Sequence, residues 1–346
     1  MIGDEVRTVA AANVPKRVLD AFPLSAASFV VTLYGDLVAP RGGELWTGNI
    51  VETLSTLGIA EPRVRTALSR LVAAGRLDGT KSGRRSYYRL TPPAAEEFSN
   101  AARLIYAPAP APLRGWHLVA LPETGREAAM AALRRLRFGF VTPQLAVLPN
   151  RGAPLPRLPG YLFSAVTDDD LCALLRGAWP LAALAERMRY FIDRFELLGS
   201  DDLRSPAALG LRLILVHAFR ELALRDPLLP PALLPSDWPG AEVRALFARL
   251  YLGLSPETDA IIAAQFTDRS GPLRPDLARI EERLNCLRAV TLDGDVGAQI
   301  GPRPAKFQPQ PAGHQFVTGK PRAGFRCDTR EGVGIVGRRL RQPLDL

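Results

Sequence analysis

The sequence has no apolar run long enough to cross a membrane. None of its 346 residues lies in a stretch approaching about 18 uninterrupted apolar positions. The N-terminal residues also lack the charged start, apolar run and cleavage site, in that order, of a secretory signal peptide. We therefore expect a cytoplasmic protein with no membrane partner. Its 47% hydrophobic content is enough for two or three folded domains.

Cysteine and histidine are scarce and scattered. The three cysteines, Cys172, Cys286 and Cys327, are far apart and have no CxxC spacing, so they indicate neither a disulfide framework nor a zinc site. Of the three histidines, His117 and His217 lie among apolar neighbours, which is typical of hydrogen-bonded core residues. No HExxH, Walker or strand-linked GxGxxG motif is present. The sequence therefore predicts no catalytic residue, no metal site and no cofactor. We expect that the protein is not an enzyme.

Apolar periodicity predicts an α+β fold with several domains. Prolines are dense near residue 110 and indicate a stiff linker after the first domain. Past about Thr267 the periodicity weakens, except for a possible helix over 277–287, so we expect a tail with little order. The predicted parts are a flexible arm (1–24), a first domain of short helices and a hairpin (25–107), a small α+β domain (113–175), a helical domain (179–267) and the tail (268–346).

The first domain reads as three short helices followed by a hairpin. Apolar residues mark one helix from Ser25 to about Val38 and a second over 45–57. Because three short helices must bury their apolar sides against one another, we expect Tyr34 and Trp46 in the core. Together with the helix from Pro62, this order predicts a winged helix-turn-helix.

The third helix has the features of a recognition helix. From Pro62 its apolar residues follow the spacing of one helix face: Val64, Ala67, Leu68, Leu71 and Val72. Polar side chains on the opposite face can reach base edges or phosphates in a major groove. The predicted DNA-binding residues of this helix are Arg63, Arg65, Thr66, Ser69 and Arg70.

Two strand-like runs, 76–81 and 85–90, follow this helix and are joined by turn residues. Residues 62–90 contain eight Lys or Arg and a single acid, Asp78. Such local charge is typical of a surface that binds a polyanion. The predicted recognition helix beside the hairpin indicates that this polyanion is double-stranded DNA. A solvated basic face is the alternative interpretation. From the hairpin, Lys81, Arg84 and Arg85 are expected to hold phosphates.

Further along, strand, helix, strand, strand over about 116–166 predicts a ferredoxin-like unit. Helical patterns then begin at Leu181 and predict helices over 209–224, 242–252 and 256–266. The proline-rich run from Asp226 to Pro235 is predicted to be a rigid, extended connector.

Six sequence motifs cover most of residues 25–266: SFVVTLYGD (28–36), RGGELWTGNIVETLSTLGI (41–59), VRTALSRLVAAGRL (64–77), GRRSYYRLT (83–91), RDPLLPPALLPSDWPG (225–240) and ALFARLY (245–251). Together they resemble the PaaX family, repressors of bacterial phenylacetic-acid catabolic operons. The resemblance implies a winged helix, a central domain similar to Cas2, and a C-terminal helical domain, in a dimer. It also implies an acyl-CoA effector such as phenylacetyl-CoA, whose binding releases DNA. Family members typically have tryptophan where this chain has Arg76.

A CoA ester needs cations for its phosphates and an apolar slot for its acyl group. In the helical domain, Arg187, Arg189 and Arg194 are the candidate effector-binding residues, although a pairing such as Arg189 with Asp193 on the helix surface is the simpler interpretation.

Two further functions stay open. The regulator could respond to another acyl-CoA or to none. The likeness to Cas2 also allows a metal-dependent nuclease, with Mg²⁺ held by Asp168, Asp169 and Asp170, but three acids at the start of a helix are more simply a favourable N-terminal charge.

Overall fold

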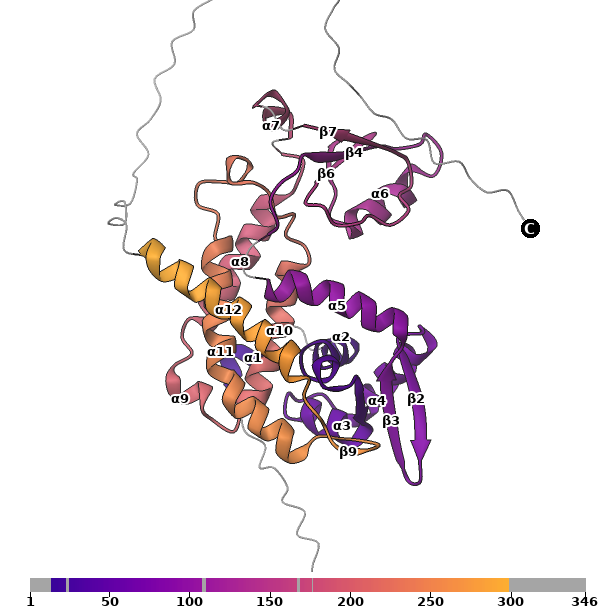
Figure 1. Cartoon of the computed structure of the whole chain (residues 1–346), viewed down its shortest axis with the longest axis vertical. Helices are drawn as coiled ribbons and strands as arrows, with labels where there is room; N and C mark the ends of the chain where they lie inside the picture. The colour runs from indigo at the N-terminus through magenta and orange to yellow at the C-terminus, as the bar shows by residue number, and fades with distance from the viewer. Residues whose placement is uncertain (1–13, 23–24, 108–109, 167–168, 176, 299–346) are drawn as a thin grey trace, which may run out of the picture.

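The computed structural model describes residues 14–22, 25–107, 110–166, 169–175 and 177–298 (Figure 1). It is a mixed α+β fold, as predicted, with helices and small antiparallel sheets. Most of the predicted flexible arm and residues 299–346 of the predicted tail lie outside the described residues.

Part of the predicted arm is packed rather than loose. Residues 16–19 form the short helix α1 (Lys16–Leu19), and Val14 and Val18 are buried in the main core. These two side chains are four residues apart, so both lie on the side of the segment that faces the core.

The N-terminal unit has the predicted order of elements. The predicted helix from Pro62 and the two predicted hairpin strands are confirmed. Its three-stranded sheet has the order β1-β3-β2 and is antiparallel throughout. The elements are α2 (Ala26–Leu33), the π-helical η1 (Tyr34–Val38), the 3₁₀ turn η2 (Ala39–Arg41), β1 (Glu44–Trp46), α3 (Thr47–Ser55), α4 (Glu61–Ala73), β2 (Leu77–Ser82), β3 (Arg85–Leu90) and α5 (Pro92–Tyr106).

Two details of this unit differ from the prediction. The second helix begins at Thr47, because Glu44–Trp46 pairs with β3 as a strand. Trp46 is therefore only half-buried, and Arg85 lies over its ring at 4.6 Å, whereas Tyr34 is buried as predicted. Val72 was predicted on the apolar face of α4 but is 39% exposed. At 3.6 residues per turn it is rotated roughly 80° from Val64, beyond the edge of the packed face.

The central unit is a four-stranded antiparallel sheet with the order β5-β6-β4-β7. The predicted strand, helix, strand, strand sequence is present, and residues 150–160 connect β6 to β7 without a helix. The elements are β4 (Trp116–Ala120), α6 (Arg126–Arg135), β5 (Gly139–Thr142), β6 (Leu145–Pro149), β7 (Tyr161–Ala165) and α7 (Asp169–Leu175).

The C-terminal part is helical, as predicted, but longer. Two predicted helices over 242–252 and 256–266 are one continuous helix that contains Pro256. Pro256 is exposed, while Leu254 and Thr258 on either side of it are buried and hold the backbone in place. The elements are α8 (Leu181–Phe195), α9 (Ser200–Leu203), α10 (Ala208–Ala223), the 3₁₀ turn η3 (Pro231–Leu233), α11 (Gly240–Gln265), β8 (Thr267–Asp268), β9 (Gly271–Pro272) and α12 (Leu277–Ala298).

The expectation of low order from residue 268 is wrong for residues 268–276 and 288–298, whereas the possible helix over 277–287 is present as the first part of α12. A two-stranded hairpin, β8-β9, leads into α12, which lies along α11 (Figure 1). Leu273, Leu287 and Val290 are buried in the main core. The few apolar residues of this segment are enough, because an arginine of α12 also enters a buried polar cluster described below.

The N-terminal unit and the C-terminal helices share one hydrophobic core instead of forming two separate cores. Phe29, Leu33 and Ile50 belong to the same buried cluster as Phe219 and Phe247. Helix α10 lies between the two parts and is apolar on nearly all sides, as expected for a helix in the centre of a core.

The proline-rich connector joins the central sheet to the helices. Leu229 and Leu233 are buried against Trp116 of β4. From the central unit, Arg137 donates to the carbonyl of Asp226 at 3.1 Å, and Arg151 donates to that of Leu228 at 3.2 Å. The predicted extended path is present only in part, because Leu228 has a left-handed φ of 54° and Pro231–Leu233 form a 3₁₀ turn.

Candidate nucleic-acid interface and adjoining cavities

One face of α4 is buried and the other is free of the rest of the protein. Val64, Ala67 and Leu68 pack into the core, which turns the polar residues outward. All five residues predicted to bind DNA from this helix are exposed: Arg63, Arg65, Thr66, Ser69 and Arg70. At 3.6 residues per turn, Thr66 and Ser69 are central on the exposed face, with Arg63 and Arg70 along one edge and Arg65 along the other.

These residues differ in whether their side chains already have a partner within the protein. Arg65 forms an ion pair with Glu61 one turn earlier, at 2.6 Å, and the Thr66 hydroxyl donates to the Pro62 carbonyl at 2.8 Å. Within the described part of the chain, Arg63 and Arg70 have no side-chain hydrogen bond or ion pair. Arg63 and Arg70 can therefore bind an external group without breaking a contact.

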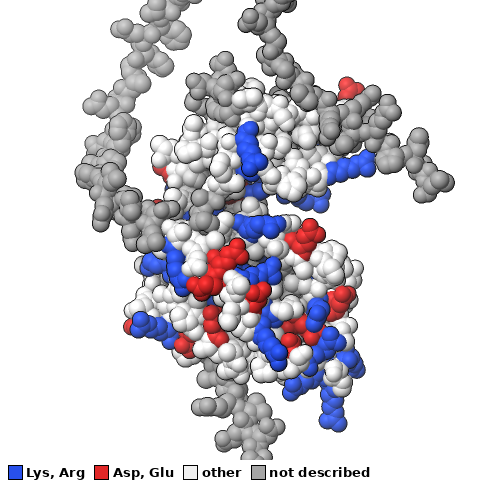
Figure 2. Space-filling model, viewed as in Figure 1, with Lys and Arg blue, Asp and Glu red and all other residues white. Residues whose placement is uncertain are grey.

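The β2–β3 hairpin carries the other predicted cations. Gly83 adopts the left-handed conformation, with a φ of 59°, and so allows the tight turn that exposes Lys81 and Arg84. Arg85 lies over Trp46, and Arg89 lies 3.5 Å from Glu44. Figure 2 shows Lys and Arg gathered over this hairpin, at the lower right of the molecule. The structure thus places the exposed face of α4 and a cationic hairpin in one unit.

A buried ionic cluster connects this unit to the C-terminal helices. The Asp36 carboxylate on η1 is fully buried and lies 2.9 Å from Arg212 of α10 and 3.0 Å from Arg283 of α12. It also accepts hydrogen bonds from the hydroxyls of Tyr106 on α5, at 2.9 Å, and of Tyr251 on α11, at 2.8 Å. Burial opposes ionisation, but the two arginines outweigh it and lower the pKa of Asp36. Asp36 therefore stays charged and holds five elements together.

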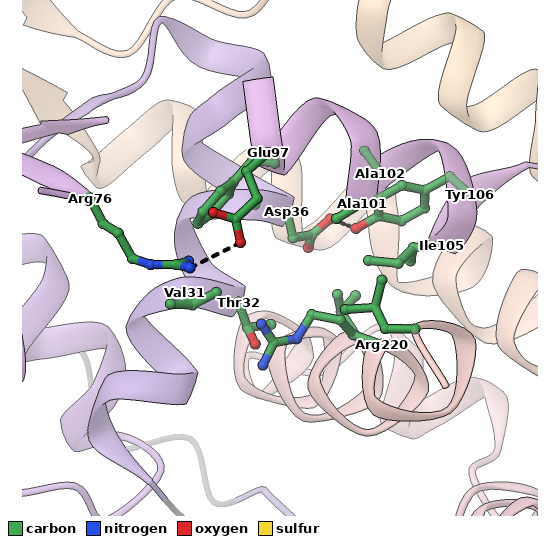
Figure 3. Close-up of a pocket in the computed structure, with 14 residues that line it drawn as sticks. Val31, Thr32, Asp36, Arg76, Glu97, Ala101, Ala102, Ile105, Tyr106 and Arg220 are labelled. Atoms are coloured by element: carbon green, nitrogen blue, oxygen red, sulfur yellow. Dashed lines mark hydrogen bonds and ion pairs between the residues drawn. The ribbon is translucent and has the colours of Figure 1, made fainter. Parts of the chain in front are cut away.

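A cavity of about 110 Å³ adjoins this cluster, at the junction of α2, η1, α5 and α10, and we name it the helix-junction cavity. Figure 3 shows Arg76 and Arg220 entering it from opposite sides. Arg76 lies in the short turn that follows α4. It forms an ion pair with Glu97 of α5 at 3.0 Å. Most of the wall is apolar: Val31, Phe98, Ala101, Ala102, Ile105, Val216 and Leu224.

Arg220 is unusual because it has no acidic partner in the cavity. Its Nη2 donates to the Ser28 hydroxyl at 2.8 Å, and its Nε is buried without a partner among the described residues. Burial lowers the pKa of Arg220, and Glu221 offsets this only in part. A buried donor of this kind is costly unless a ligand or water binds it.

Four arginines line a second and larger cavity, of about 570 Å³, on the other side of α5. We name it the arginine groove. Arg89 comes from β3, Arg274 from the segment after β9, and Arg279 and Arg283 from α12. The only acid among the residues that line this groove is Asp276.

The predicted effector-binding residues lie elsewhere. Arg187 pairs with Glu221 at 3.3 Å, Arg189 pairs with Asp237, and Arg194 lies over the ring of Tyr190 at 4.8 Å. All three are exposed on α8, and none lines either cavity. Whether they bind an effector stays a prediction.

No described helix is both long and apolar enough to span a bilayer. Among the described residues no three His, Cys, Asp or Glu side chains are grouped as metal ligands would be. Asp168 lies outside the described residues, so the acidic triplet is not tested.

Residues 25–94 match the family described as PaaX-like protein, and residues 179–264 match the PaaX-like protein C-terminal domain. The chain is also 31% identical over 281 residues to the transcriptional repressor PaaX of Escherichia coli (strain K12), which covers 74% of this chain and 88% of the relative. The chain belongs to the PaaX-like protein family. The N-terminal PaaX-like match contains α4 and the hairpin, and the C-terminal match contains Arg212 and Arg220.

Sequence reasoning missed the Asp36 cluster and the arginine groove. Both have a signal in the sequence: Asp36 lies within the mostly apolar run FVVTLYGDLV (29–38), and Arg212 interrupts the apolar run LGLRLILV. A charge within an apolar run is rarely buried without a partner of opposite sign, so the two could have been paired. Arg274, Arg279 and Arg283 were missed because their segment was interpreted as tail.

Proposed function

We propose that this protein is a DNA-binding transcriptional repressor, in which α2, α3, α4 and the β2–β3 hairpin form a winged helix-turn-helix. The observation that carries the proposal is the exposed, unpaired edge of α4, Arg63 and Arg70, in the same unit as a cationic hairpin. The printed name of the relative from Escherichia coli supports the same role. In this proposal α4 lies in the major groove of an operator.

The individual residues have separate tasks in the complex. Arg63 and Arg70 contact base edges or phosphates, and Thr66 and Ser69 contact the groove floor between them. Arg65 adds a contact once it leaves Glu61. From the hairpin, Lys81, Arg84 and Arg85 hold the sugar-phosphate backbone.

The central unit is proposed to be a ferredoxin-like scaffold of the Cas2 kind that takes part in a homodimer. Its strand order and antiparallel directions support the assignment, although a loop occupies the place of the second crossover helix. A dimer would present two copies of α4 to a two-fold symmetric operator. Light scattering on the purified full chain tests this: a mass of two chains is expected, and a monomer at micromolar concentration contradicts it.

We also propose that an aromatic acyl-CoA such as phenylacetyl-CoA releases the repressor from the operator of a phenylacetate-type catabolic operon. The helix-junction cavity supports a ligand because it lies between Arg76, at the end of α4, and the central helix α10. The alternatives are a regulator that answers another acyl-CoA and one that needs no ligand.

Fluorescence anisotropy with labelled fragments from upstream of the gene tests both statements. Tight binding that weakens steeply with salt is expected, and phenylacetyl-CoA should release the DNA. Absence of binding even at low salt contradicts the repressor proposal. Binding that no acyl-CoA alters contradicts only the effector proposal.

A further inference from the structure

We infer that the helix-junction cavity and the arginine groove form one two-part site for a ligand with a phosphorylated end and an apolar end. The inference rests on the proposed function in one respect: it locates the effector of that regulator. The phosphates would lie in the groove, and the apolar group would lie in the cavity beneath Arg76.

The two cavities adjoin each other. Gly35, Phe98 and Ala102 line both, so α5 and η1 form a common wall. A Cβ atom at Gly35 would lie 3.3 Å from the Phe98 ring, which is closer than usual, so glycine keeps this wall thin. In the proposed site, one elongated molecule crosses this wall and reaches both cavities.

The groove has an excess of positive charge. Among the described residues, Arg274 has no side-chain hydrogen bond or ion pair, and the guanidinium group of Arg279 donates only to the Ala39 carbonyl and the Ser99 hydroxyl, at 3.5 and 3.3 Å. Arg283 shares Asp36 with Arg212, so that one carboxylate faces two guanidinium groups. Phosphate oxygens are strong acceptors for such donors, and several arginines favour more than one phosphate.

The cavity suits the other end of the ligand. Its wall is mostly apolar, and its volume of about 110 Å³ is of the order of the ~150 Å³ apolar cavity that holds benzene, so it admits a small aromatic or short acyl group. The buried Nε of Arg220 offers one unused hydrogen bond for a carbonyl or carboxylate oxygen on that group. An apolar group with one such acceptor is thus the chemistry that this cavity fits.

A ligand bound at this site would contact residues beside α4 and in the hairpin. Arg76 follows the last turn of α4, and Arg89 belongs to β3 of the hairpin. A ligand between Arg76 and Glu97 competes for their ion pair, and one that contacts Arg89 competes with Glu44. The same contacts that bind the ligand can therefore move the end of α4 and the hairpin.

Calorimetry on the full chain without DNA tests the inference, with phenylacetyl-CoA, CoA and phenylacetate as separate probes. The double variant Arg274→Gln/Arg279→Gln should lower the affinity for phenylacetyl-CoA and for CoA by roughly tenfold or more, since each ligand loses a charge-assisted contact. Ala101→Leu, which fills the cavity, should lower the affinity for phenylacetyl-CoA but not for CoA. The matched control Arg204→Gln/Arg249→Gln changes two exposed arginines outside both cavities and should bind as wild type.

Thermal unfolding of each variant checks that it is folded. Wild-type affinity in the groove variant would overturn the inference, as would equal weakening of CoA and phenylacetyl-CoA by Ala101→Leu. So would loss of binding only in Arg187→Gln/Arg189→Gln/Arg194→Gln, or no binding of any CoA compound to wild type. Because no DNA is present, these results are independent of the test for operator binding.

Discussion

At the residue scale, the cations of α4 and the hairpin fall into two groups: committed side chains, which already have a partner within the protein, and free ones. Arg65 is held by Glu61 and Arg85 by the Trp46 ring, whereas Arg63, Arg70 and Arg84 have no such contact among the described residues. Binding DNA costs the free residues only their side-chain entropy, while the committed ones must first give up a partner. The free arginines should therefore contribute most to affinity.

The arginines of α4 and of the hairpin should differ in which part of the DNA they contact, bases or phosphates. Replacing Arg84 by Ala should weaken binding to all duplexes alike and flatten the salt dependence, because a hairpin cation holds phosphates. Replacing Arg70 by Ala should relax the preference at one base pair by about 1–3 kcal/mol if the contact is direct. Anisotropy with a set of operator point variants at two salt concentrations measures both, with Arg249→Ala as the control.

Unchanged specificity in Arg70→Ala and unchanged affinity in Arg84→Ala would remove this face as the DNA-binding surface.

The buried His217 should make the free energy of unfolding decrease at acidic pH. Burial, with a smaller effect of Arg220, lowers the pKa of His217 to about 4. The unfolded chain, with a pKa near 6.5, thus binds a proton that the folded protein does not. The free energy of unfolding should fall as pH decreases from about 6.5 to about 4, by up to ~3 kcal/mol from this residue.

Urea unfolding between pH 7 and 5 measures this slope. The variant His217→Gln should have a shallower slope, since the acidic residues are the same in both proteins. An identical slope would show that His217 is protonated as easily in the folded protein as in the unfolded chain.

At this scale the sequence predicts exposed polar residues well and buried charges poorly. The exposed face of α4 follows from helix periodicity alone. Asp36 and Arg212 do not, because they are 176 residues apart and their pairing depends on how α2 and α10 pack. Trp46 was assigned to the core because its strand was interpreted as helix.

At the element scale, the helices with clear periodicity were found and their boundaries were less exact. Helix α4 and the hairpin were predicted because turn residues, apolar spacing and strand length agree. Helix α11 was divided at Pro256, which local rules treat as a helix breaker, although buried neighbours keep the helix continuous. Helix α12 was predicted only to residue 287, because residues 288–298 contain Gly294, Gly297 and β-branched residues that disfavour a helix locally.

The contribution of α12 to the core can be measured directly. Leu287 is fully buried and Leu277 on the same helix is 72% exposed, so they form a matched pair. Leu287→Ala should lower the free energy of unfolding by about 2–5 kcal/mol, whereas Leu277→Ala should change it by at most about 0.5 kcal/mol. Equal, small effects in urea unfolding would contradict the packing of α12 on α11.

At the scale of the whole molecule, the N-terminal unit and the C-terminal helices act as one body. They share a hydrophobic core, and the Asp36 cluster adds ion pairs from η1 to α10 and α12. Sequence patterns predicted separate domains because each part has its own elements, and no local pattern reports which apolar faces meet. A shared core also offers a short route between the cavities and α4.

The distribution of charge over the molecule underlies the central claim. The chain has a net charge of +9, and residues 62–90 contain eight of its cations and one acid. If this segment binds DNA, its free arginines should account for much of the salt dependence, because each neutralised phosphate releases counterions.

The salt dependence of affinity for an upstream duplex is the most direct test of DNA binding by α4 and the hairpin. The triple variant Arg63→Ala/Arg70→Ala/Arg84→Ala is compared with Arg157→Ala/Arg204→Ala/Arg249→Ala, which removes three exposed arginines from elsewhere. The account predicts that only the first variant loses more than about tenfold in affinity and flattens the slope of log K against log salt by about 2–3. Equal slopes and affinities in the two variants would contradict it.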